Sequence, residues 1–353
     1  MNEVGAYGRP RVQTKFIFMT DNKMRTEILT IDKGQCLTDV LPAIPANTIF
    51  DKTITGCGAT HSEIVNAARH SIIIEPNIPV ILGKKAEHPF LFAVYEGITK
   101  EDVKAYLAGE HDGYRKIITT PEGFDKKVLP AMHELEIPVY KDYFLLFDEC
   151  EKAIQDVGYR GDIYLPVEDF FKFENKAMVS ATPIVPSDPR FEENGFKILK
   201  LVPTYDSRIE LTLCTTNNTV AVMRKLLKRL ENETVCVFLN STETILSLIY
   251  ALGLQGRSRV FCSEKSVRKL KQMNFTDASE TLNELAPVNF LTSRFYAAVD
   301  IKLDYKPHVI LLTDVMRAPF SAVDPQTEVV QAIGRFRNGV ARAYHIANTS
   351  DSL

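Results

Sequence analysis

Short apolar runs alternate with helical patterns along almost the whole chain, and this alternation restricts the fold more than any other feature. Such an arrangement is typical of parallel sheets that are covered by helices. The sequence therefore predicts the α/β class. The predicted strands are Thr48–Phe50, Ser71–Ile74, Lys116–Thr119, Tyr143–Phe147, Ala177–Val179, Thr234–Leu239, Arg259–Cys262, Val288–Leu291, His308–Leu312 and Arg342–Ile346.

The 353 residues are enough for two domains, each with its own core. The alternating pattern breaks around Pro203, and a new helical stripe then runs from Val220 to Leu230. Asn217 or Asn218 is a suitable N-cap for this helix. We therefore place the boundary near Pro203–Ser207 and expect two α/β domains, residues 1–205 and 206–353.

Composition excludes several classes of protein. The net charge is only −3, so a surface for nucleic acid would have to be a local groove. The six cysteines form no C-x-x-C pair, which argues against zinc and disulfides and favours a reducing compartment. No apolar run reaches the roughly 18 residues that span a bilayer, and Met1–Gln13 lacks the apolar core of a signal peptide. We expect a soluble intracellular protein.

Two adjacent acids, Asp148 and Glu149, follow the strand Tyr143–Phe147 directly. A buried strand that delivers two carboxylates at its end suits a nucleotide-phosphate site. One acid can hold Mg²⁺, and the other can orient or deprotonate an attacking water. The alternative is that Asp148 only caps a helix from Glu149 to Gln155. These residues alone do not decide between the two interpretations.

The loop after the first predicted strand carries Gly56 and Gly58, and we expect a helix from His61. Glycines at a strand-to-helix turn let backbone N–H groups surround a phosphate, and the helix dipole adds to the attraction. Thr60 could supply a hydroxyl to Mg²⁺. Phosphate loops usually carry lysine before this hydroxyl residue, but Ala59 stands there. An ordinary tight turn is the alternative for the glycines.

Two accounts fit the missing lysine. In the first, Lys52 at the start of the loop reaches over the phosphates and supplies the charge, a displacement that large terminase subunits of bacteriophages also show. In the second, the site binds nucleotide weakly or is inactive, because losing one such charge typically costs about 10²–10³ in rate. The intact Asp148 and Glu149 favour the first account.

A pair of arginines lies near the C-terminus. Asp324 and Pro325 suit the start of a helix that ends in Gly-Arg-Phe-Arg, with the arginines at 335 and 337. Guanidinium groups at an interdomain cleft can stabilise the charge of a transferring γ-phosphate. A basic helix end favoured by the dipole is the alternative, and Gln331 argues against it. Upstream, we expect Phe295 and Tyr296 to be packed rather than to stack on bases.

Five short motifs now occur together: Gly-Cys-Gly-Ala-Thr, Asp-Glu-Cys-Glu, Ser-Ala-Thr, Thr-x₇-Asp and Gln-x-x-Gly-Arg-x-Arg. Their order and spacing, from Asp51 to Asn338, resemble those of superfamily 2 helicases, the relatives of DEAD/DEAH-box proteins and restriction-type translocases. The slightly degenerate motifs look most like helicases of bacteriophages and mobile elements. The resemblance implies two tandem RecA-like domains, each a mostly parallel sheet covered by helices, with ATP in the cleft between them and nucleic acid across both.

The resemblance also implies a role for each matching residue. Thr60 and Asp148 would hold Mg²⁺, and Glu149 would activate water. The residues that would couple hydrolysis to domain closure are Ser180, Ala181 and Thr182. The candidate nucleotide contacts are Thr55, Gly56, Cys57, Gly58, Ala59, Thr60 and Asp300. The candidate catalytic residues are Lys52, Asp148, Glu149, Gln331, Arg335 and Arg337, of which Arg337 matches the arginine finger.

Some residues depart from the family pattern. Ala59 replaces the lysine, Glu151 stands where His or Asp is usual, and Ala298 where Gly is usual. The second arginine of the last motif falls one place early, with Asn338 in its slot. These departures bear on the rate of hydrolysis more than on nucleotide binding. Gln35 lies at a plausible distance upstream to read adenine.

Loops at the carboxyl ends of the predicted strands are candidates for nucleic-acid contact, because open α/β sheets bind ligands there. Hydroxyls, amides and backbone N–H groups can hold phosphates without reading sequence. The basic stretch from Arg257 to Lys271 is more typical of a solvated helix face. The candidate contacts are Pro76, Asn77, Thr120, Pro121, Asn240, Ser241, Thr292, Ser293 and Arg294.

The sequence thus predicts an ATP hydrolase: a helicase or translocase that uses ATP and Mg²⁺ and binds single-stranded DNA or RNA without sequence preference. We expect a monomeric motor core that does not associate with membranes and that works with replication or packaging partners. We place it in the cytoplasm of a bacterial host or in a virion. The alternative is a catalytically impaired pseudo-helicase that acts as a nucleotide- or nucleic-acid-binding structural protein. A third interpretation, a packaging ATPase similar to terminase, is supported by the shifted lysine alone.

Overall fold

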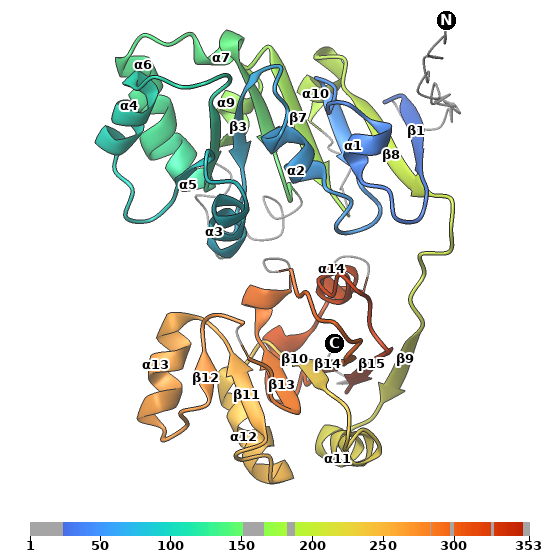
Figure 1. The fold of residues 1–353 in the computed structure, drawn as a ribbon. Helices are drawn as coiled ribbons and strands as arrows, with labels where there is room; N and C mark the ends of the chain where they lie inside the picture. The colour runs from blue at the N-terminus through green and yellow to red at the C-terminus, as the bar shows by residue number, and fades with distance from the viewer. Residues whose placement is uncertain are drawn as a thin grey trace, which may run out of the picture. The chain divides into compact units, whose positions relative to one another are not determined.

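A computed structural model describes residues 24–150, 166–181, 188–282, 284–296, 300–325 and 328–348. The chain divides into two compact units. Unit 1 comprises the described residues up to Pro76 and from His88 to Asp206, and unit 2 comprises Asn77–Glu87 and the described residues from Ser207. Each unit contains one sheet flanked by helices, so the fold is two tandem RecA-like domains (Figure 1). The predicted α/β class is confirmed.

The sheet of unit 1 has eight strands, and its central strands are buried on both faces. The neighbouring strands of this sheet pair in parallel, as in β2 (Thr48–Asp51) with β7 (Asn175–Ser180) and β6 (Tyr143–Phe147) with β7. Parallel strands covered on both faces read as unbroken apolar runs, which is why the sequence identified β6. The spatial order is β1 (Thr26–Ile31), β8 (Lys197–Pro203), β2 (Thr48–Asp51), β7 (Asn175–Ser180), β6 (Tyr143–Phe147), β3 (His70–Ile74), β5 (Lys116–Thr119) and β4 (Phe92–Val94).

Short helices connect these strands. The best-capped is α4, whose N-cap Thr99 and Asp102 form a reciprocal capping box. A further helix, α3 (Ile78–Glu87), has its contacts with unit 2. The helical segments of unit 1 are α1 (Leu37–Val40), α2 (Ala59–Ile64), α4 (Lys100–Ala108), α5 (Pro121–Gly123), η1 (Phe124–Val128), α6 (Leu129–Glu134), α7 (Val139–Asp142), α9 (Pro166–Phe170) and α10 (Pro189–Glu193).

The sheet of unit 2 has seven strands. Alternate residues of its central strand enter two separate cores: Val235 and Val237 enter one, and Cys236 and Phe238 enter the other. Both faces of the sheet are therefore covered, as period-two alternation requires. The spatial order is β12 (Ala278–Ser279), β11 (Ser258–Phe261), β13 (Val288–Leu291), β10 (Val235–Phe238), β14 (His308–Thr313), β15 (Arg342–Ala347) and β9 (Leu211–Thr215).

The helices of unit 2 follow the sequence closely where a polar cap precedes an apolar stripe. Asn218 caps the predicted helix, because its side chain accepts a hydrogen bond from the Ala221 N–H. No helix among the described residues has the length and apolar character needed to cross a membrane. The helical segments are α11 (Thr219–Arg229), α12 (Thr242–Leu252), α13 (Glu264–Gln272), η3 (Ser293–Phe295), η4 (Pro319–Ser321) and α14 (Glu328–Gly334).

The sequence missed the strands at or near the sheet edges. In β9, Leu213 is 62% exposed, so the strand lacks the apolar run that marks a buried one. In β8, Lys197 forms an ion pair with Glu27 of β1, with 2.8 Å between Nζ and Oε2. The pattern does break around Pro203 as predicted, because β8 ends there. Pro203 is the last residue of β8, where a residue without an N–H is tolerated.

A buried charged cluster connects α2 with the starts of β3 and β5. Glu63 is fully buried and accepts hydrogen bonds from Arg69 Nε at 3.0 Å and Nη2 at 2.5 Å. Lys116 Nζ lies 3.7 Å from Glu63 Oε1 and donates to the Arg69 carbonyl at 2.9 Å. Burial lowers the pKa of Lys116 to about 8, although the Glu63 charge acts against it. Two cations thus depend on one carboxylate.

Replacing this carboxylate should destabilise the fold strongly. We expect Glu63→Gln to lower the free energy of unfolding by about 3–5 kcal/mol, because it leaves the buried Lys116 and the half-buried Arg69 without their counter-charge. Urea unfolding followed by circular dichroism measures the change. The matched control is Glu101→Gln, an exposed residue whose i,i+3 partner is Lys104 and which should change stability by less than about 1 kcal/mol. Equal effects of the two substitutions would contradict the prediction.

Candidate functional site

Three charged side chains meet at the carboxyl edge of the sheet of unit 1. Lys52 follows β2, and Asp148 and Glu149 follow β6, with β7 between these strands. Lys52 Nζ lies 3.3 Å from Asp148 Oδ1 and 3.0 Å from Glu149 Oε1. The three residues are 7%, 1% and 4% exposed, respectively. Burying such charges costs several kcal/mol per ion. A strand end with a purely structural role does not require buried charges.

The loop between β2 and α2 has the backbone of a phosphate cradle. Gly56 and Gly58 have φ angles of 76° and 87°, in the left-handed region where glycine is favoured. A Cβ added to Gly58 would meet no atom within 4 Å, so there is room beside the backbone. The Cys57 carbonyl accepts a hydrogen bond from Leu37 N at 2.8 Å, which ties the loop to α1. The helix begins at Ala59, two residues earlier than predicted.

Ala59 is 4% exposed, so the residue at the position of the usual lysine is part of the packed interior. The neighbouring Thr60 donates a hydrogen bond from its hydroxyl to Asp148 Oδ2. A hydroxyl beside a carboxylate is a donor set of hard oxygens, which suits Mg²⁺. Within the described residues no group of three or more His, Cys, Asp or Glu side chains could hold a metal. A magnesium ion here would need phosphate oxygens to complete its shell, as is usual for nucleotide-bound Mg²⁺.

Backbone strain occurs at two residues of this site. Thr53 and Glu149 have φ angles of 50° and 48°, a left-handed conformation that is uncommon for residues other than glycine. Each such residue costs about 1–3 kcal/mol, and such residues cluster at active sites. The Glu149 N–H donates to Asp148 Oδ1 at 2.9 Å. Most of the alternative helix from Glu149 to Gln155 lies outside the described residues.

The end of β7 lies directly beside the start of the loop. Ser180 is fully buried, and its carbonyl accepts a hydrogen bond from Lys52 N at 2.9 Å. Cys150 N, just after the acidic pair, donates to the Val179 carbonyl at 3.2 Å. The strand that ends in Ser180 and Ala181 is thus bonded to both halves of the charged cluster. Thr182 lies outside the described residues.

In unit 2, the two arginines of the last motif surround Asp300. Arg337 donates a hydrogen bond to Asp300 Oδ1, and Arg335 Nη1 lies 3.9 Å from the same oxygen. The backbone between Arg335 and Arg337 pairs with Ile301, whose N–H donates a hydrogen bond to the Arg335 carbonyl at 2.8 Å. Burial raises the pKa of Asp300, but the hydrogen bond and charge of Arg337 outweigh it, so the pKa lies below its usual value. Asp300 therefore holds both arginines as an ionised carboxylate.

Gln331 lies on the helix that precedes these arginines and is 1% exposed. Its backbone carbonyl accepts a hydrogen bond from Arg335 Nε at 3.3 Å. The described part of the helix begins at Glu328, whose Oε2 accepts a hydrogen bond from Asp324 N at 2.9 Å. The predicted helix start at Asp324 and Pro325 is therefore separated from α14 by two residues outside the described ranges.

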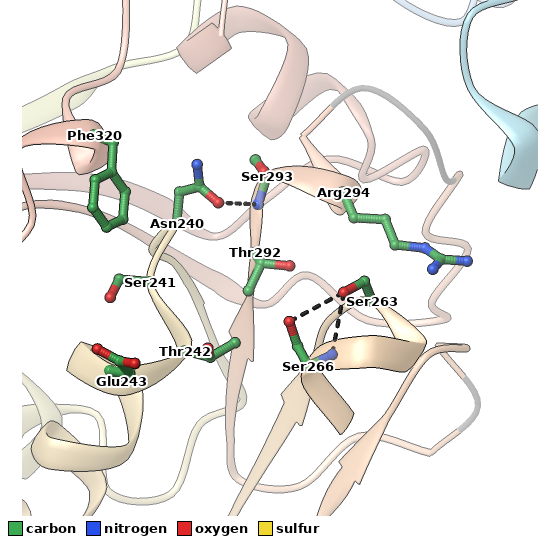
Figure 2. A pocket seen from close by; sticks show the side chains of 10 residues that line it. All are labelled: Asn240, Ser241, Thr242, Glu243, Ser263, Ser266, Thr292, Ser293, Arg294 and Phe320. Carbon is green, nitrogen blue, oxygen red and sulfur yellow. Dashed lines mark hydrogen bonds between the residues drawn. The ribbon is translucent and has the colours of Figure 1, made fainter. Parts of the chain in front are cut away.

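A polar pocket of about 370 Å³ lies at the carboxyl ends of the strands of unit 2 (Figure 2). It brings together the predicted nucleic-acid contacts Asn240, Ser241, Thr292, Ser293 and Arg294. Asn240 Oδ1 accepts a hydrogen bond from Ser293 N at 3.4 Å, which joins two of the loops. Ser241 and Ser263 cap α12 and α13. The lining residues are Asn240, Ser241, Thr242, Glu243, Ser263, Ser266, Thr292, Ser293, Arg294 and Phe320.

Ser263, Ser266 and Phe320 come from segments that had not been predicted to contact nucleic acid, whereas Thr242 and Glu243 directly follow the predicted Asn240 and Ser241. Ser263 carries a usable signal, because a serine between a predicted strand and a helical pattern is a good N-cap at the carboxyl edge. Phe320 carries none, since an isolated phenylalanine after proline has no pattern around it. The predicted packing of Phe295 and Tyr296 is confirmed, with exposures of 1% and 2%.

The predicted nucleic-acid contacts of the first half are more buried. Thr120 is 5% exposed, and its hydroxyl accepts a hydrogen bond from Gly123 N at 3.0 Å as the N-cap of α5. Pro121 is the first residue of that helix. Pro76 is buried after β3, and the Asn77 carbonyl accepts from Val80 N at 3.0 Å as α3 begins. These residues shape two strand-to-helix turns.

No protein-family model matches the sequence, and no curated protein matches it. Among solved structures, the chain is similar to Dbp5 of S. cerevisiae bound to RNA and ADP BeF3, with a TM-score of 0.53 and 14% identity over 87% of this chain and 80% of that one. A variant of the same yeast protein bound to a Gle1 variant and IP6 has a TM-score of 0.51 and 13% identity, over 87% of this chain and 79% of that one. A DEAD box protein of Methanococcus jannaschii has a TM-score of 0.43 and 16% identity, over 87% of this chain and 83% of that one.

Sequence identity at this level shows a common fold and nothing finer. The fold resembles that of Dbp5.

Proposed function

We propose that this chain is an ATP-dependent nucleic-acid helicase or translocase. The observation that supports this most is the position of Lys52, which enters from the start of the glycine loop and contacts Asp148 and Glu149. A cation is thereby supplied next to the loop in which Ala59 supplies none. This is the arrangement expected if Lys52 replaces the usual lysine of the phosphate loop.

The residues of unit 1 divide the chemistry among themselves. The backbone from Thr55 to Thr60 would hold the phosphates of ATP, and Lys52 would move from the two carboxylates to the phosphate oxygens. Thr60 and Asp148 would hold Mg²⁺, which neutralises charge on the transferring phosphoryl group. Glu149 would orient and deprotonate the attacking water. Gln35, which accepts a hydrogen bond from Asp32 N at 2.8 Å, lies in the turn before α1 and is a candidate for adenine contact.

Residues of unit 2 would complete the site. We propose domain bounds of 1–205 and 206–353, with α3 part of the first domain by chain connectivity. Arg335 and Arg337 would stabilise the transition state, together with Gln331, and Asp300 would hold the two guanidinium groups ready and contact the nucleotide. The segment Ser180–Thr182 would couple hydrolysis to closure of the two domains.

Nucleic acid would bind without sequence preference through the polar pocket of unit 2 and the turns at Pro76, Asn77, Thr120 and Pro121 in the first half of the chain. Dbp5, whose fold is similar, has been solved with RNA bound. A type close to bacteriophage or mobile-element helicases, with replication or packaging partners in a bacterial cytoplasm or a virion, is proposed from the degenerate motifs alone.

Turnover measured with and without single strands tests this function. We expect ATP hydrolysis by the full chain to require Mg²⁺ and to rise about tenfold or more with single-stranded DNA or RNA, a barrier change of about 1.4 kcal/mol. A coupled phosphate-release assay measures it, with a double-stranded blunt duplex as the control. Hydrolysis at the same rate with and without every nucleic acid would contradict the proposal.

The second candidate function is a pseudo-helicase that binds nucleotide or nucleic acid without turnover. The buried contact of Lys52 with both carboxylates favours it, because a satisfied charge cluster can persist without a ligand. In that case the same assay gives no phosphate release, while nucleotide or single strands still bind.

A further inference from the structure

Phe320 stands out among the side chains that line the polar pocket of unit 2. It is 59% exposed, and every other lining residue carries a polar side chain. Figure 2 shows the ring at one end of the pocket, with Asn240 and Ser241 beside it and Arg294 at the other end. A phenyl ring left in solvent contributes nothing to the binding of phosphate. Its presence requires another explanation.

The loop that carries Phe320 is closed by its own hydrogen bonds. Asp314 N donates to Ser321 Oγ at 2.8 Å, and Ser321 N donates to the Ala318 carbonyl at 2.8 Å. Ala318 N in turn donates to the Asp314 carbonyl at 2.8 Å. Ala318 and Ser321, on either side of Pro319 and Phe320, are fully buried. The backbone next to the exposed ring is therefore anchored in the core.

A buried polar network fixes the same loop to the rest of unit 2. Asp314 is 3% exposed and accepts hydrogen bonds from Thr219 Oγ1 at 3.1 Å and from Asn348 Nδ2 at 2.7 Å. Asn348 Oδ1 accepts from Val315 N at 2.8 Å. These bonds connect the loop to the start of α11 and the residue after β15. Because this backbone is held in place before binding, only the side-chain torsions of Phe320 would have to be ordered when a ligand arrives.

The polar side of the pocket suits a phosphodiester. Hydroxyl and amide groups come from Asn240, Ser241 and Thr292, and Arg294 supplies a positive charge. The one carboxylate in the lining, Glu243, is paired with Lys269 at 2.5 Å, so it does not repel an anion at full strength. A ligand that satisfies both sides of the pocket needs an anionic group and a flat apolar face. A nucleotide unit of a single strand has both.

The other aromatic residues of this region are not available for stacking. Phe295 and Tyr296 are buried between the sheet and its helices, where they pack edge-on against Phe261 and Phe238. Phe320 is the only exposed aromatic residue in the described lining of the pocket.

We propose that Phe320 stacks on a nucleobase of a single strand whose phosphates lie in the polar pocket. The inference rests on the proposed function and goes further, because it names a residue that contacts a base and requires that the base be free to leave its neighbours. In a duplex, neighbouring bases cover the faces of each base, so this ring could not stack on them. Stacking of a base on an aromatic side chain tolerates any sequence, since every base has a π-face.

Binding of a fluorescent single-stranded oligonucleotide to the full chain tests the proposal. We expect Phe320→Leu to raise the Kd about 5- to 150-fold, the range reported for loss of one stacked base, and Phe320→Tyr to leave it almost unchanged. The matched control is Tyr250→Leu, an aromatic residue that is 50% exposed near the far end of α12 and should leave the Kd within about twofold. Thermal unfolding verifies that each variant is folded.

An oligonucleotide with abasic sites separates stacking from other roles. The proposal predicts that abasic strands bind the unsubstituted chain weakly and that Phe320→Leu weakens their binding no further. If Phe320→Leu leaves the affinity for the intact strand unchanged, or weakens intact and abasic strands equally, this inference is wrong while the helicase proposal stands. If the unsubstituted chain binds no single strand at all, both proposals fall.

Discussion

The substitution Lys52→Ala should lower the kcat of ATP hydrolysis by about 10²–10³. This is the usual effect of removing one preorganised charge at a reacting phosphoryl group. Lys52 is buried and contacts Asp148 and Glu149, whereas Ala59 provides no charge at the usual position. Phosphate release under saturating ATP and single strands measures the loss.

The chain offers a matched control for this substitution. Lys200 lies on the neighbouring strand β8 and pairs with Asp51 at 3.6 Å, but it is 45% exposed at its side chain. We expect Lys200→Ala to leave kcat within about twofold, since an exposed ion pair contributes little. Adding Ala59→Lys to Lys52→Ala should restore part of the activity by returning a lysine to the loop. Full turnover by Lys52→Ala would refute the displaced-lysine account.

The substitution Glu149→Gln should separate binding from chemistry. The amide keeps the shape of the side chain and can still accept a hydrogen bond from Lys52, but it cannot take a proton from water. We expect kcat to fall by about 10²–10⁴, the contribution typical of a general base, while the affinity for ATP changes little. Single-turnover hydrolysis and nucleotide titration measure the two quantities.

A second acidic variant serves as the contrast. Asp148 contacts the Thr60 hydroxyl, and in the proposed site both hold Mg²⁺. Asp148→Asn should therefore weaken Mg²⁺-dependent nucleotide binding, which Glu149→Gln leaves intact. If Glu149→Gln hydrolyses ATP at the original rate, Glu149 is not the base and the assignment of the acidic pair fails.

The central strands could be predicted from the sequence because burial on both faces leaves an unbroken apolar run. The strands β3, β5, β6 and β13 were located within a residue. The outer strands could not be found in this way. In β8, lysines at 197 and 200 interrupt the apolar pattern, and β4 has only three residues. Propensity fails where half of a strand faces solvent or charged partners.

The charged cluster of unit 1 was partly accessible from the sequence. Residues that directly follow parallel strands of one sheet lie at the same edge, so Lys52, Asp148 and Glu149 were expected on one edge, but their proximity depends on the strand order, in which only β7 separates β2 from β6. The contacts of Arg337 and Arg335 with Asp300 depend on side-chain rotamers and on the pairing of two distant segments. Phe320 depends on a buried network around Asp314 whose members are scattered from Thr219 to Asn348. Neither arrangement leaves a local sequence pattern.

A crystal structure of the full chain with Mg²⁺ and a non-hydrolysable ATP analogue tests the central claim most directly. The account predicts that Lys52 Nζ leaves the two carboxylates and lies within hydrogen-bond distance of a terminal phosphate oxygen, with the metal between Thr60 and Asp148. A nucleotide bound away from the glycine loop, or a bound nucleotide with Lys52 still paired to Asp148 and Glu149, would contradict it.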